Sequence, residues 1–265
     1  MRAFLRIEQR GALATVTLNR PKVRNALNSE LSTALTRTFH RLAGKARVVV
    51  LRGEGPAFCA GADIEEMQRL TEADFDTQRA QAMALQQMFQ AIGNFPGVTI
   101  ARVHGAAIGG GAGLAAVCDI AIAAEEAFFA FSEVRIGLIP ATIAPWVVQK
   151  VGLGTARALF VTGERITATE ALRIGLVQQV AMPNALDEAI ERKVEAILQC
   201  GPEAIAAVKR LLLHLQGFSP ATFPMAETAD ITVFYLIERR MSAEAREGFR
   251  AFLEKRRPSF HETLP

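Results

Sequence analysis

The 265-residue chain lacks several features that mark whole classes of protein. Its three cysteines, Cys59, Cys118 and Cys200, lie far apart and form no C-x-x-C pair, so we expect neither a disulfide framework nor a zinc site. No apolar run approaches the roughly 18 residues of a membrane-spanning helix. The four histidines are isolated, without the spacing of metal ligands. These absences exclude disulfide-stapled, membrane-spanning and zinc-binding classes.

The chain also lacks a large excess of positive or negative charge. The 30 basic and 27 acidic residues leave a net charge of +3, which is too balanced for a nucleic-acid-binding surface. Only one tryptophan and one tyrosine occur, so no aromatic-rich basic face is available to stack bases. Hydrophobic residues make up 50% and charged residues 22%, which excludes disorder for the bulk of the chain. Because no long apolar segment precedes a cleavage site at the N-terminus, we expect a cytoplasmic protein.

Hydrophobic periodicity predicts an α/β fold. Strands are expected at 12–18, 47–51, 98–103, 119–123 and 127–131, with helices at 28–42, 64–70 and 75–92 between them. After residue 136 the pattern is helical, at 145–151, 155–161, 169–175, 186–199, 203–215, 221–238 and 242–255. We therefore expect a core over 1–200 and a helical region over 201–265. The apolar faces of these last helices need a partner, and self-association is the simplest one.

Two loops of small residues are candidates for chemistry, because the sequence has no P-loop, no G-x-G-x-x-G and no G-x-S-x-G. They read FCAGADI at 58–64 and HGAAIGGG at 104–111. A helix that starts after such a loop offers unpaired N–H groups to a ligand. Two such groups aimed at one point form an oxyanion hole, with each donor worth about 2.7–4 kcal/mol in the transition state. The same glycines are also compatible with a purely structural role in tight packing.

A third candidate is Glu133, which follows the apolar run AFFAF and precedes an apolar turn. A carboxyl group in such a setting is desolvated, so its acid form is favoured and it can both take and return a proton. The alternative is a structural salt bridge to nearby Arg135.

Together these segments resemble the crotonase family, also called the enoyl-CoA hydratase/isomerase family. The matching segments, in chain order, are RPKVRNALN at 20–28, FCAGADI, HGAAIGGG, SEVRIGLIP at 132–140, FVTGERITA at 160–168, ALRIGLV at 171–177 and EGFRAFLEKRRPSF at 247–260. They cover nearly the whole chain. The resemblance implies a ββα spiral core over 1–200 that binds acyl-CoA. It also implies a C-terminal helical part over 201–265 that builds trimers, often paired into hexamers.

The resemblance further implies roles for individual residues. The backbone N–H groups of Ala62 and Gly110 would hold the thioester oxygen, and Glu133 would transfer protons. No cofactor beyond the coenzyme A of the substrate is implied, and neither is a metal, a nucleic acid or a membrane. The expected substrate-binding set is Lys22, Arg24, Ala60, Asp63, Ile64, Gly109, Gly113, Trp146 and Lys255. For the three cations a solvated surface role stays open, and for Trp146 burial in the core.

The chain departs from the family at Gly113, where well-studied hydratases carry a second glutamate. The loss removes volume and a negative charge, which would favour a substrate that is branched at C3 or bears its own carboxylate. The pattern resembles the subgroup that hydrates 3-methylglutaconyl-CoA, in leucine breakdown, or isohexenylglutaconyl-CoA, in acyclic terpene breakdown. We expect the isohexenyl ester, because Gly113, Ala112 and Ala116 are small. A Δ3,Δ2-enoyl-CoA isomerase and an acyl-CoA decarboxylase remain alternatives. A non-enzymatic RNA-binding or scaffold role is disfavoured by the charge.

Overall fold

The computed structural model describes residues 4–215 and 225–264, with side chains left out between 216 and 229. The chain forms two compact units, Met1–Lys193 and Val194–Pro265, and the boundary between them falls inside helix α7 (Leu186–Leu198).

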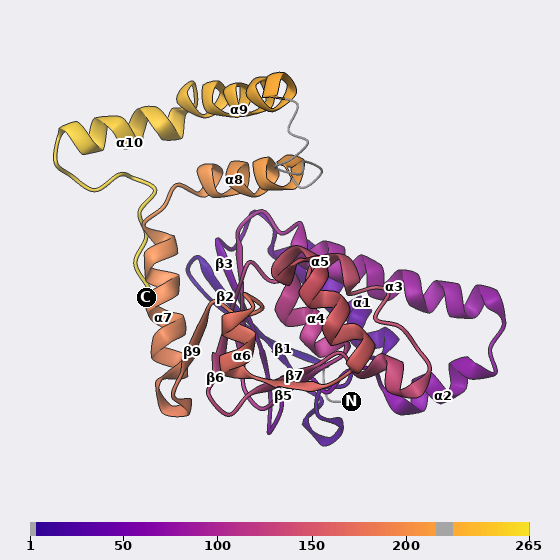
Figure 1. The fold of residues 1–265 in the computed structure, drawn as a ribbon. Coiled ribbons are helices and arrows are strands. Elements are labelled where there is room, and N and C mark those ends of the chain that lie inside the picture. Colours follow the sequence, from indigo (N-terminus) through magenta and orange to yellow (C-terminus); the bar gives the residue numbers. More distant parts are fainter. Residues whose placement is uncertain (1–3, 216–224, 265) are drawn as a thin grey trace. The chain divides into compact units, whose positions relative to one another are not determined.

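The first unit is built on a six-stranded sheet (Figure 1). Its strands, in spatial order, are β1 (Leu5–Arg10), β2 (Leu13–Leu18), β3 (Val48–Gly53), β4 (Val98–Val103), β6 (Ile120–Ala124) and β9 (Gln179–Ala181). The first pair is antiparallel and the other pairs are parallel. Runs such as VVVL in β3 are almost wholly buried, as expected for strands that are covered on both faces.

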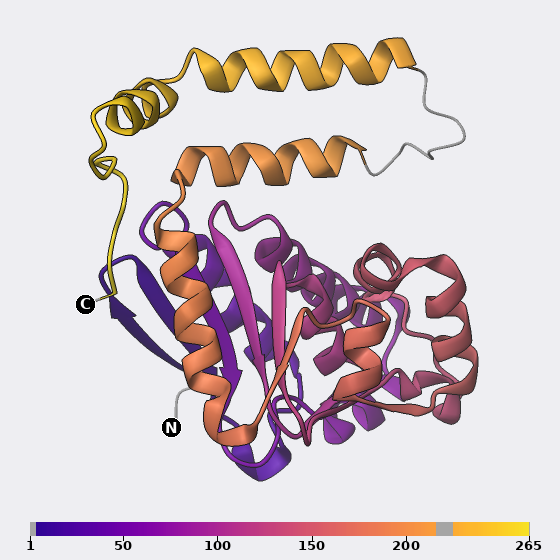
Figure 2. The same cartoon turned by 60° about the vertical axis from the view of Figure 1, so that its left-hand side comes forward.

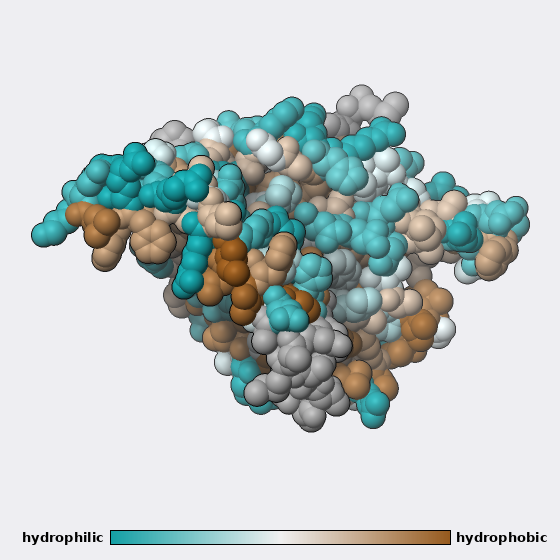
Figure 3. Space-filling view, turned by 90° about the horizontal axis from the view of Figure 1, so that it is seen from above, coloured by the Kyte–Doolittle hydropathy of each residue, from teal (hydrophilic) through white to brown (hydrophobic). Residues whose placement is uncertain are grey.

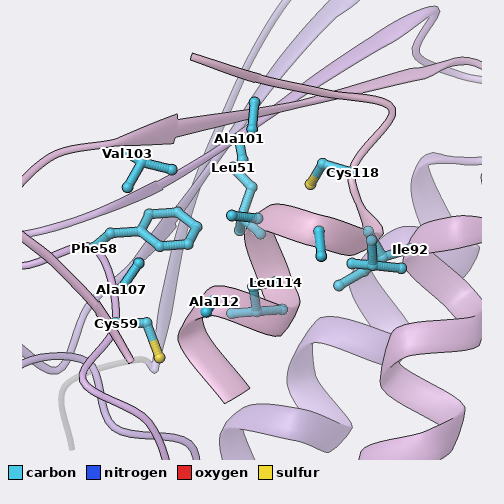
Figure 4. Close-up of a cluster of buried hydrophobic side chains, with 14 of the residues drawn as sticks. Leu51, Phe58, Cys59, Ile92, Ala101, Val103, Ala107, Ala112, Leu114 and Cys118 are labelled. Atoms are coloured by element: carbon cyan, nitrogen blue, oxygen red, sulfur yellow. The ribbon is translucent and has the colours of Figure 1, made fainter. Parts of the chain in front are cut away.

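A smaller sheet carries the second glycine-rich segment. It orders β5 (Ala106–Ile108), β7 (Phe128–Ala130) and β8 (Arg165–Thr167). Strand β5 leads directly into α4 (Gly110–Val117), in which every residue after Gly110 is buried. Figure 4 shows side chains of α4 packed among Phe58, Ile92 and neighbouring apolar residues. The helix is rich in small residues because it lies inside the core.

The other helices of this unit begin and end at sequence signals. α1 (Ser29–Leu42) begins where the Asn28 side chain accepts a hydrogen bond from the Leu31 N–H at 2.9 Å. α2 (Ile64–Thr71) begins after Asp63 in the same way. α3 (Phe75–Gly93) packs against α1, and α6 (Ala168–Arg173) follows β8. Short 3-10 turns lie at Pro21–Val23, Ser132–Ile136 and Pro183–Ala185.

The second unit contains α8 (Pro202–Leu215), α9 (Met225–Arg240) and α10 (Ala243–Leu253), with α8 and α9 side by side (Figure 2). The Ser242 hydroxyl accepts a hydrogen bond from the Ala245 N–H, so it caps α10 as the sequence predicts. Hydrophilic and hydrophobic side chains lie on different sides of α10, at the left of Figure 3. Its exposed apolar side chains include Phe249, Phe252 and Leu253. The role of this unit in oligomerisation stays a prediction.

Several expected elements need correction. Strands β1, β5, β8 and β9 were not predicted, because they are short or half-exposed and have little apolar alternation. The stretch 104–111, expected as a turn, contains β5. The helices expected at 145–151 and 155–161 form one element, α5 (Ala144–Thr162), interrupted only at Gly152, where φ is 77°. The first residues expected for the helix at 221–238 lie outside the described residues.

Candidate active site

The two loops of small residues lie side by side. The Phe58 N–H donates to the His104 carbonyl at 2.9 Å, and the Ile108 N–H donates to the Cys59 carbonyl at 3.0 Å. Cys59 pairs with Ala107 in a parallel bridge. Ala62 pairs with Leu27 in a second parallel bridge, and a Cβ on Gly110 would lie 2.8 Å from Leu27 Cδ1. Both predicted oxyanion donors therefore border Leu27.

Glycine is required where these loops touch. A Cβ atom on Gly111 would lie 2.1 Å from the Cys59 carbonyl oxygen, which no side chain tolerates. Gly61 has a φ of +97°, and its Cβ would lie 3.0 Å from the Ile108 carbonyl oxygen. The structural role of these glycines is therefore confirmed, since they allow close packing of backbone on backbone. Their role in placing the two N–H donors stays a prediction.

Both N–H groups are available to a ligand. Leu27 binds the residues on both sides of Ala62. Its N–H donates to the Gly61 carbonyl at 2.7 Å, and its carbonyl accepts from the Asp63 N–H at 2.8 Å. Within the described ranges the Ala62 N–H has no acceptor. Gly110 is the first residue of α4, so its N–H has no intrahelical partner and lies at the positive end of the helix.

Glu133 lies directly over the start of α4. A Cβ on Gly109, whose φ is +52°, would be 2.9 Å from Glu133 Oε1. Glu133 Oε2 is buried, and no hydrogen-bond donor reaches it from the part of the chain that the structure describes. Burial raises the pKa of Glu133, and a backbone N–H opposes this in part. The carboxyl group is thus desolvated, as the sequence predicts.

The alternative of a salt bridge between Glu133 and Arg135 is not realised. No ion pair joins the two side chains among the described residues, and Arg135 instead packs beside Gly163, where a Cβ would lie 3.2 Å from Arg135 Nε. The Glu133 carboxylate is therefore not neutralised by Arg135, and it lies beside the Gly109–Gly110 turn.

Gly113 lies one helical turn beyond Gly109, whose carbonyl accepts the Gly113 N–H at 2.9 Å. A Cβ at this position would lie 2.3 Å from Ile143 Cγ2 and 3.3 Å from Phe89 Cε1. The expectation that the missing glutamate frees volume here is therefore wrong, because the Ile143 side chain fills the space. Ala112 and Ala116 are likewise buried in the core. The other part of the expectation, that Gly113 carries no negative charge where a glutamate would, is unaffected by this packing.

Trp146 lies one turn further along α5 than Ile143. Its ring packs so closely on α3 that a Cβ on Gly93 would be 2.5 Å from it. The indole is partly buried against the core, which is the role that the sequence left open for it. Its Nε1 is buried without a hydrogen-bond partner among the described residues.

The residues expected near coenzyme A gather around Leu27 and the start of α2. The Ala60 N–H donates to the Arg24 carbonyl at 2.9 Å. Asp63 caps α2 and pairs with Arg20 at 2.8 Å. Burial alone would raise the pKa of Asp63, but Arg20 and the helix N–H groups outweigh burial and lower it. The Asp63 carboxylate is thus engaged by Arg20 and the start of α2, and it is not free to bind a ligand.

The remaining expected residues are more open. Lys22 lines a pocket of about 440 Å³ together with Phe4, Pro21 and Val23. Ile64 is 81% exposed beside the first loop. Lys255 follows α10 in the second unit and has a φ of 53°.

Sequence reasoning missed Asn25, which is fully buried. Its Nδ2 donates to the Ala57 carbonyl at 2.8 Å and to the Glu54 carbonyl at 2.9 Å, so it fixes the approach to the first loop. Arg20 was missed in the same way. Both residues lie in the segment 20–28 that resembles the family, and that resemblance is the signal that could have identified them as supports of the loop.

No described helix is both long and apolar enough to cross a membrane. No group of three or more histidine, cysteine or acidic side chains gathers among the described residues in a way that would hold a metal ion.

Comparison with known proteins agrees with this geometry. Residues 8–263 match the family model described as enoyl-CoA hydratase/isomerase. The enoyl-CoA hydratase ACTT6 of Alternaria alternata is 36% identical over 206 residues, 77% of this chain and 67% of that protein. The crystal structure of an enoyl-CoA hydratase from Mycobacterium smegmatis is 34% identical, with a TM-score of 0.90 over 98% of this chain and 100% of that one. AtuE of Pseudomonas aeruginosa is 35% identical, with a TM-score of 0.91 over 98% and 100%.

Proposed function

We propose a substrate class for this chain from the premise that it belongs to the enoyl-CoA hydratase/isomerase family. The chain has the crotonase fold, as the sequence predicts, and it is an enoyl-CoA hydratase in the general sense. Its substrate is therefore an acyl-CoA thioester. The proposal is that this thioester is a 3-branched enoyl-CoA with a second carboxylate, isohexenylglutaconyl-CoA or 3-methylglutaconyl-CoA.

The observation that carries the proposal is the pair of side chains that face α4. The Glu133 carboxylate lies over Gly109, whereas one turn further on the apolar Ile143 side chain covers Gly113. A second buried carboxylate there would repel a substrate that carries its own negative charge. The apolar replacement removes that repulsion. The proposal rests on charge, since the volume at Gly113 is occupied.

The chemistry needs only one group that moves protons. The N–H groups of Ala62 and Gly110 would hold the thioester oxygen, so that C3 becomes electrophilic and the enolate is stabilised as it forms. Glu133 would take a proton from water while the water oxygen bonds to C3. It would then return that proton to C2 on the same face, so that one water is added syn. No cofactor is needed in this scheme, because coenzyme A belongs to the substrate.

The size of the branch depends on Ile143. A methyl branch needs little room, whereas an isohexenyl branch directed towards α4 requires the Ile143 side chain to move. In Ile143→Ala we expect the ratio of kcat/KM for the isohexenyl ester to that for the methyl ester to rise about tenfold or more, since one or two methylene groups are worth roughly that factor. Val147→Ala, one turn further along α5 and equally buried, should leave the ratio unchanged.

The decisive experiment incubates the protein separately with 3-methylglutaconyl-CoA, isohexenylglutaconyl-CoA and crotonyl-CoA. Loss of the conjugated-thioester absorbance is followed, and products are identified by mass. We expect addition of one water to a branched ester, lost in Glu133→Gln and kept in Glu30→Gln, which alters an exposed carboxylate on α1. Faster turnover of crotonyl-CoA than of both branched esters would refute the substrate class. Double-bond migration without added water would identify the isomerase, and release of carbon dioxide the decarboxylase.

We also propose that the second unit builds a homotrimer, alone or paired into a hexamer. Support comes from the large apolar side chains that α9 and α10 leave exposed, among them Phe234, Phe249 and Phe252. Charged replacements on one such face, as in Phe252→Glu, should lower the mass measured by light scattering. A wild-type protein whose measured mass is that of a monomer would refute the proposed assembly.

A further inference from the structure

Two arginines lie side by side near the carboxyl ends of two neighbouring central strands of the sheet. Arg52, near the end of β3, is paired in register with Arg102 on β4. Like charges opposite one another on neighbouring strands are destabilising unless an anion lies near them. Asp187, in the first turn of α7, accepts from Arg102 through Oδ1 at 2.5 Å and Oδ2 at 3.1 Å. That carboxylate is hydrogen-bonded to Arg102, and the charges of Arg102 and Arg52 both help to lower its pKa.

Arg52 has no such partner. No hydrogen bond or ion pair is formed by its guanidinium with the described residues, and its Nε is buried. The side chain is half-buried, so that water compensates only part of its charge. A cation held in this way costs free energy until an acceptor reaches it.

The two arginines line a pocket of about 300 Å³, together with His104, Glu54, Glu126 and the start of α7. His104 Nε2 donates to the Gly55 carbonyl at 2.8 Å, and Nδ1 lies 3.4 Å from Arg102. Burial lowers the pKa of His104, and both arginines lower it further, against the opposing effects of the Gly55 carbonyl and Glu126. Glu54 is already bound to Arg6 at 2.5 Å, and Glu126 is exposed at the rim.

We propose that this pocket binds a small tetrahedral oxyanion of the size of inorganic phosphate, with Arg52 as its main donor. Arg52 would give it charge-assisted hydrogen bonds. The N-terminus of α7, a helix of 13 residues, adds its positive end on the same side. Asp187 already shows that a negatively charged oxygen is accommodated beside Arg102.

The pocket borders the segment that leads into the first loop of small residues, at 58–64. Gly53 and Gly55 line it, and a Cβ on Gly53 would meet the Ala57 and Phe58 carbonyl oxygens at 2.5 Å. An anion bound there would hold this segment against β4. We therefore expect occupancy to slow amide exchange at 53–58 in the free protein.

The test measures thermal unfolding of the full chain without coenzyme A, with inorganic phosphate titrated against chloride at constant ionic strength. We expect a saturable rise of a few degrees in the wild type. Arg52→Gln should raise the apparent dissociation constant about tenfold, as expected when one charge-assisted contact is lost. Arg173→Gln, which removes an exposed arginine paired with Glu170, is the matched control and should behave like the wild type.

A crystal soaked in selenate supplies a second readout, because its anomalous signal should lie within hydrogen-bond distance of Arg52. Equal phosphate dependence in the wild type and Arg52→Gln, or no anomalous peak in the pocket, would overturn the proposal. It would also be overturned if phosphate had no effect and Arg52→Gln instead lowered the oligomeric mass, since the acceptor would then be a carboxylate of another copy. None of these outcomes depends on which thioester the enzyme hydrates.

Discussion

Replacing Gly113 by alanine tests how the site has been remodelled around its missing carboxylate. In a helix interior, glycine to alanine normally stabilises by about 1 kcal/mol. Here the new methyl group would lie 2.3 Å from Ile143 Cγ2, and overpacking of a core costs about 1–3 kcal/mol. The cost outweighs the gain, so we expect Gly113→Ala to lower the free energy of unfolding by about 1 kcal/mol.

Removing the obstacle should reverse the sign. Ile143→Ala alone should cost about 2–5 kcal/mol, because it leaves a cavity. In that background the methyl group at 113 loses the contact with Cγ2 and meets the Cβ of residue 143 at 2.9 Å and Phe89 Cε1 at 3.3 Å. The cavity leaves room for the small shift that relieves these two contacts. Gly113→Ala should then stabilise by about 1 kcal/mol, which makes the coupling between the two sites about 2 kcal/mol.

The assay is urea unfolding of the wild type, both single variants and the double variant at one protein concentration, since self-association would contribute to the measured stability. Gly154→Ala is the control, because that helical glycine has open space around it and should stabilise equally in both backgrounds. A neutral or stabilising Gly113→Ala in the wild type, or strictly additive free energies, would refute the reasoning. A confirmed result would mean that a second glutamate cannot be restored at 113 without first trimming Ile143.

Further predictions concern the carboxylates. Glu133→Gln should lower kcat by about 10²–10⁴-fold with little loss of stability, measured by steady-state kinetics and urea unfolding; a fall below tenfold would count against Glu133 as the proton carrier. Because burial raises the pKa of Glu133, kcat/KM should fall as the pH drops through that raised value, and a pH profile should place the midpoint above the ordinary range of glutamate. Gly109→Ala should lower kcat about tenfold, because a φ of +52° strains alanine and its Cβ crowds Glu133, whereas unchanged kinetics would contradict the placement. Asp63→Ala should cost about 0.5–2 kcal/mol. Since the folded pKa of Asp63 is lowered, this contribution is present above the unfolded pKa and lost as the pH falls through the folded one, so the wild type and variant should converge in acid.

The sequence predicted the parts of the fold that local patterns determine. The Asn28, Asp63 and Ser242 caps, the buried strand at β3 and the desolvated Glu133 all follow from residue type and neighbours. Strands such as β5 could not be predicted, because three residues carry no periodicity and the pairing of β5 with β7 depends on tertiary structure.

The sequence names candidate residues for the site but says nothing of the space around them. It singles out Gly113 as the position that departs from the family's pattern, but no local signal links Gly113 to Ile143, thirty residues later. Contacts at such separation are fixed by tertiary packing of α4 on α5. For the same reason the partnerless Arg52 opposite Arg102 is invisible until the register of the sheet is known.

The contact between the two loops involves main-chain atoms, whereas the proposed proton transfer involves side chains. The two loops touch through backbone atoms at Gly61 and Gly111. Substitutions elsewhere in the site leave these atoms in place. In the proposed mechanism, the groups that hold a negative oxygen therefore belong to the main chain, while the groups that move protons are side chains that can be exchanged one residue at a time. A chain built in this way can change which reaction it performs without first losing the ability to stabilise the intermediate that the reactions share.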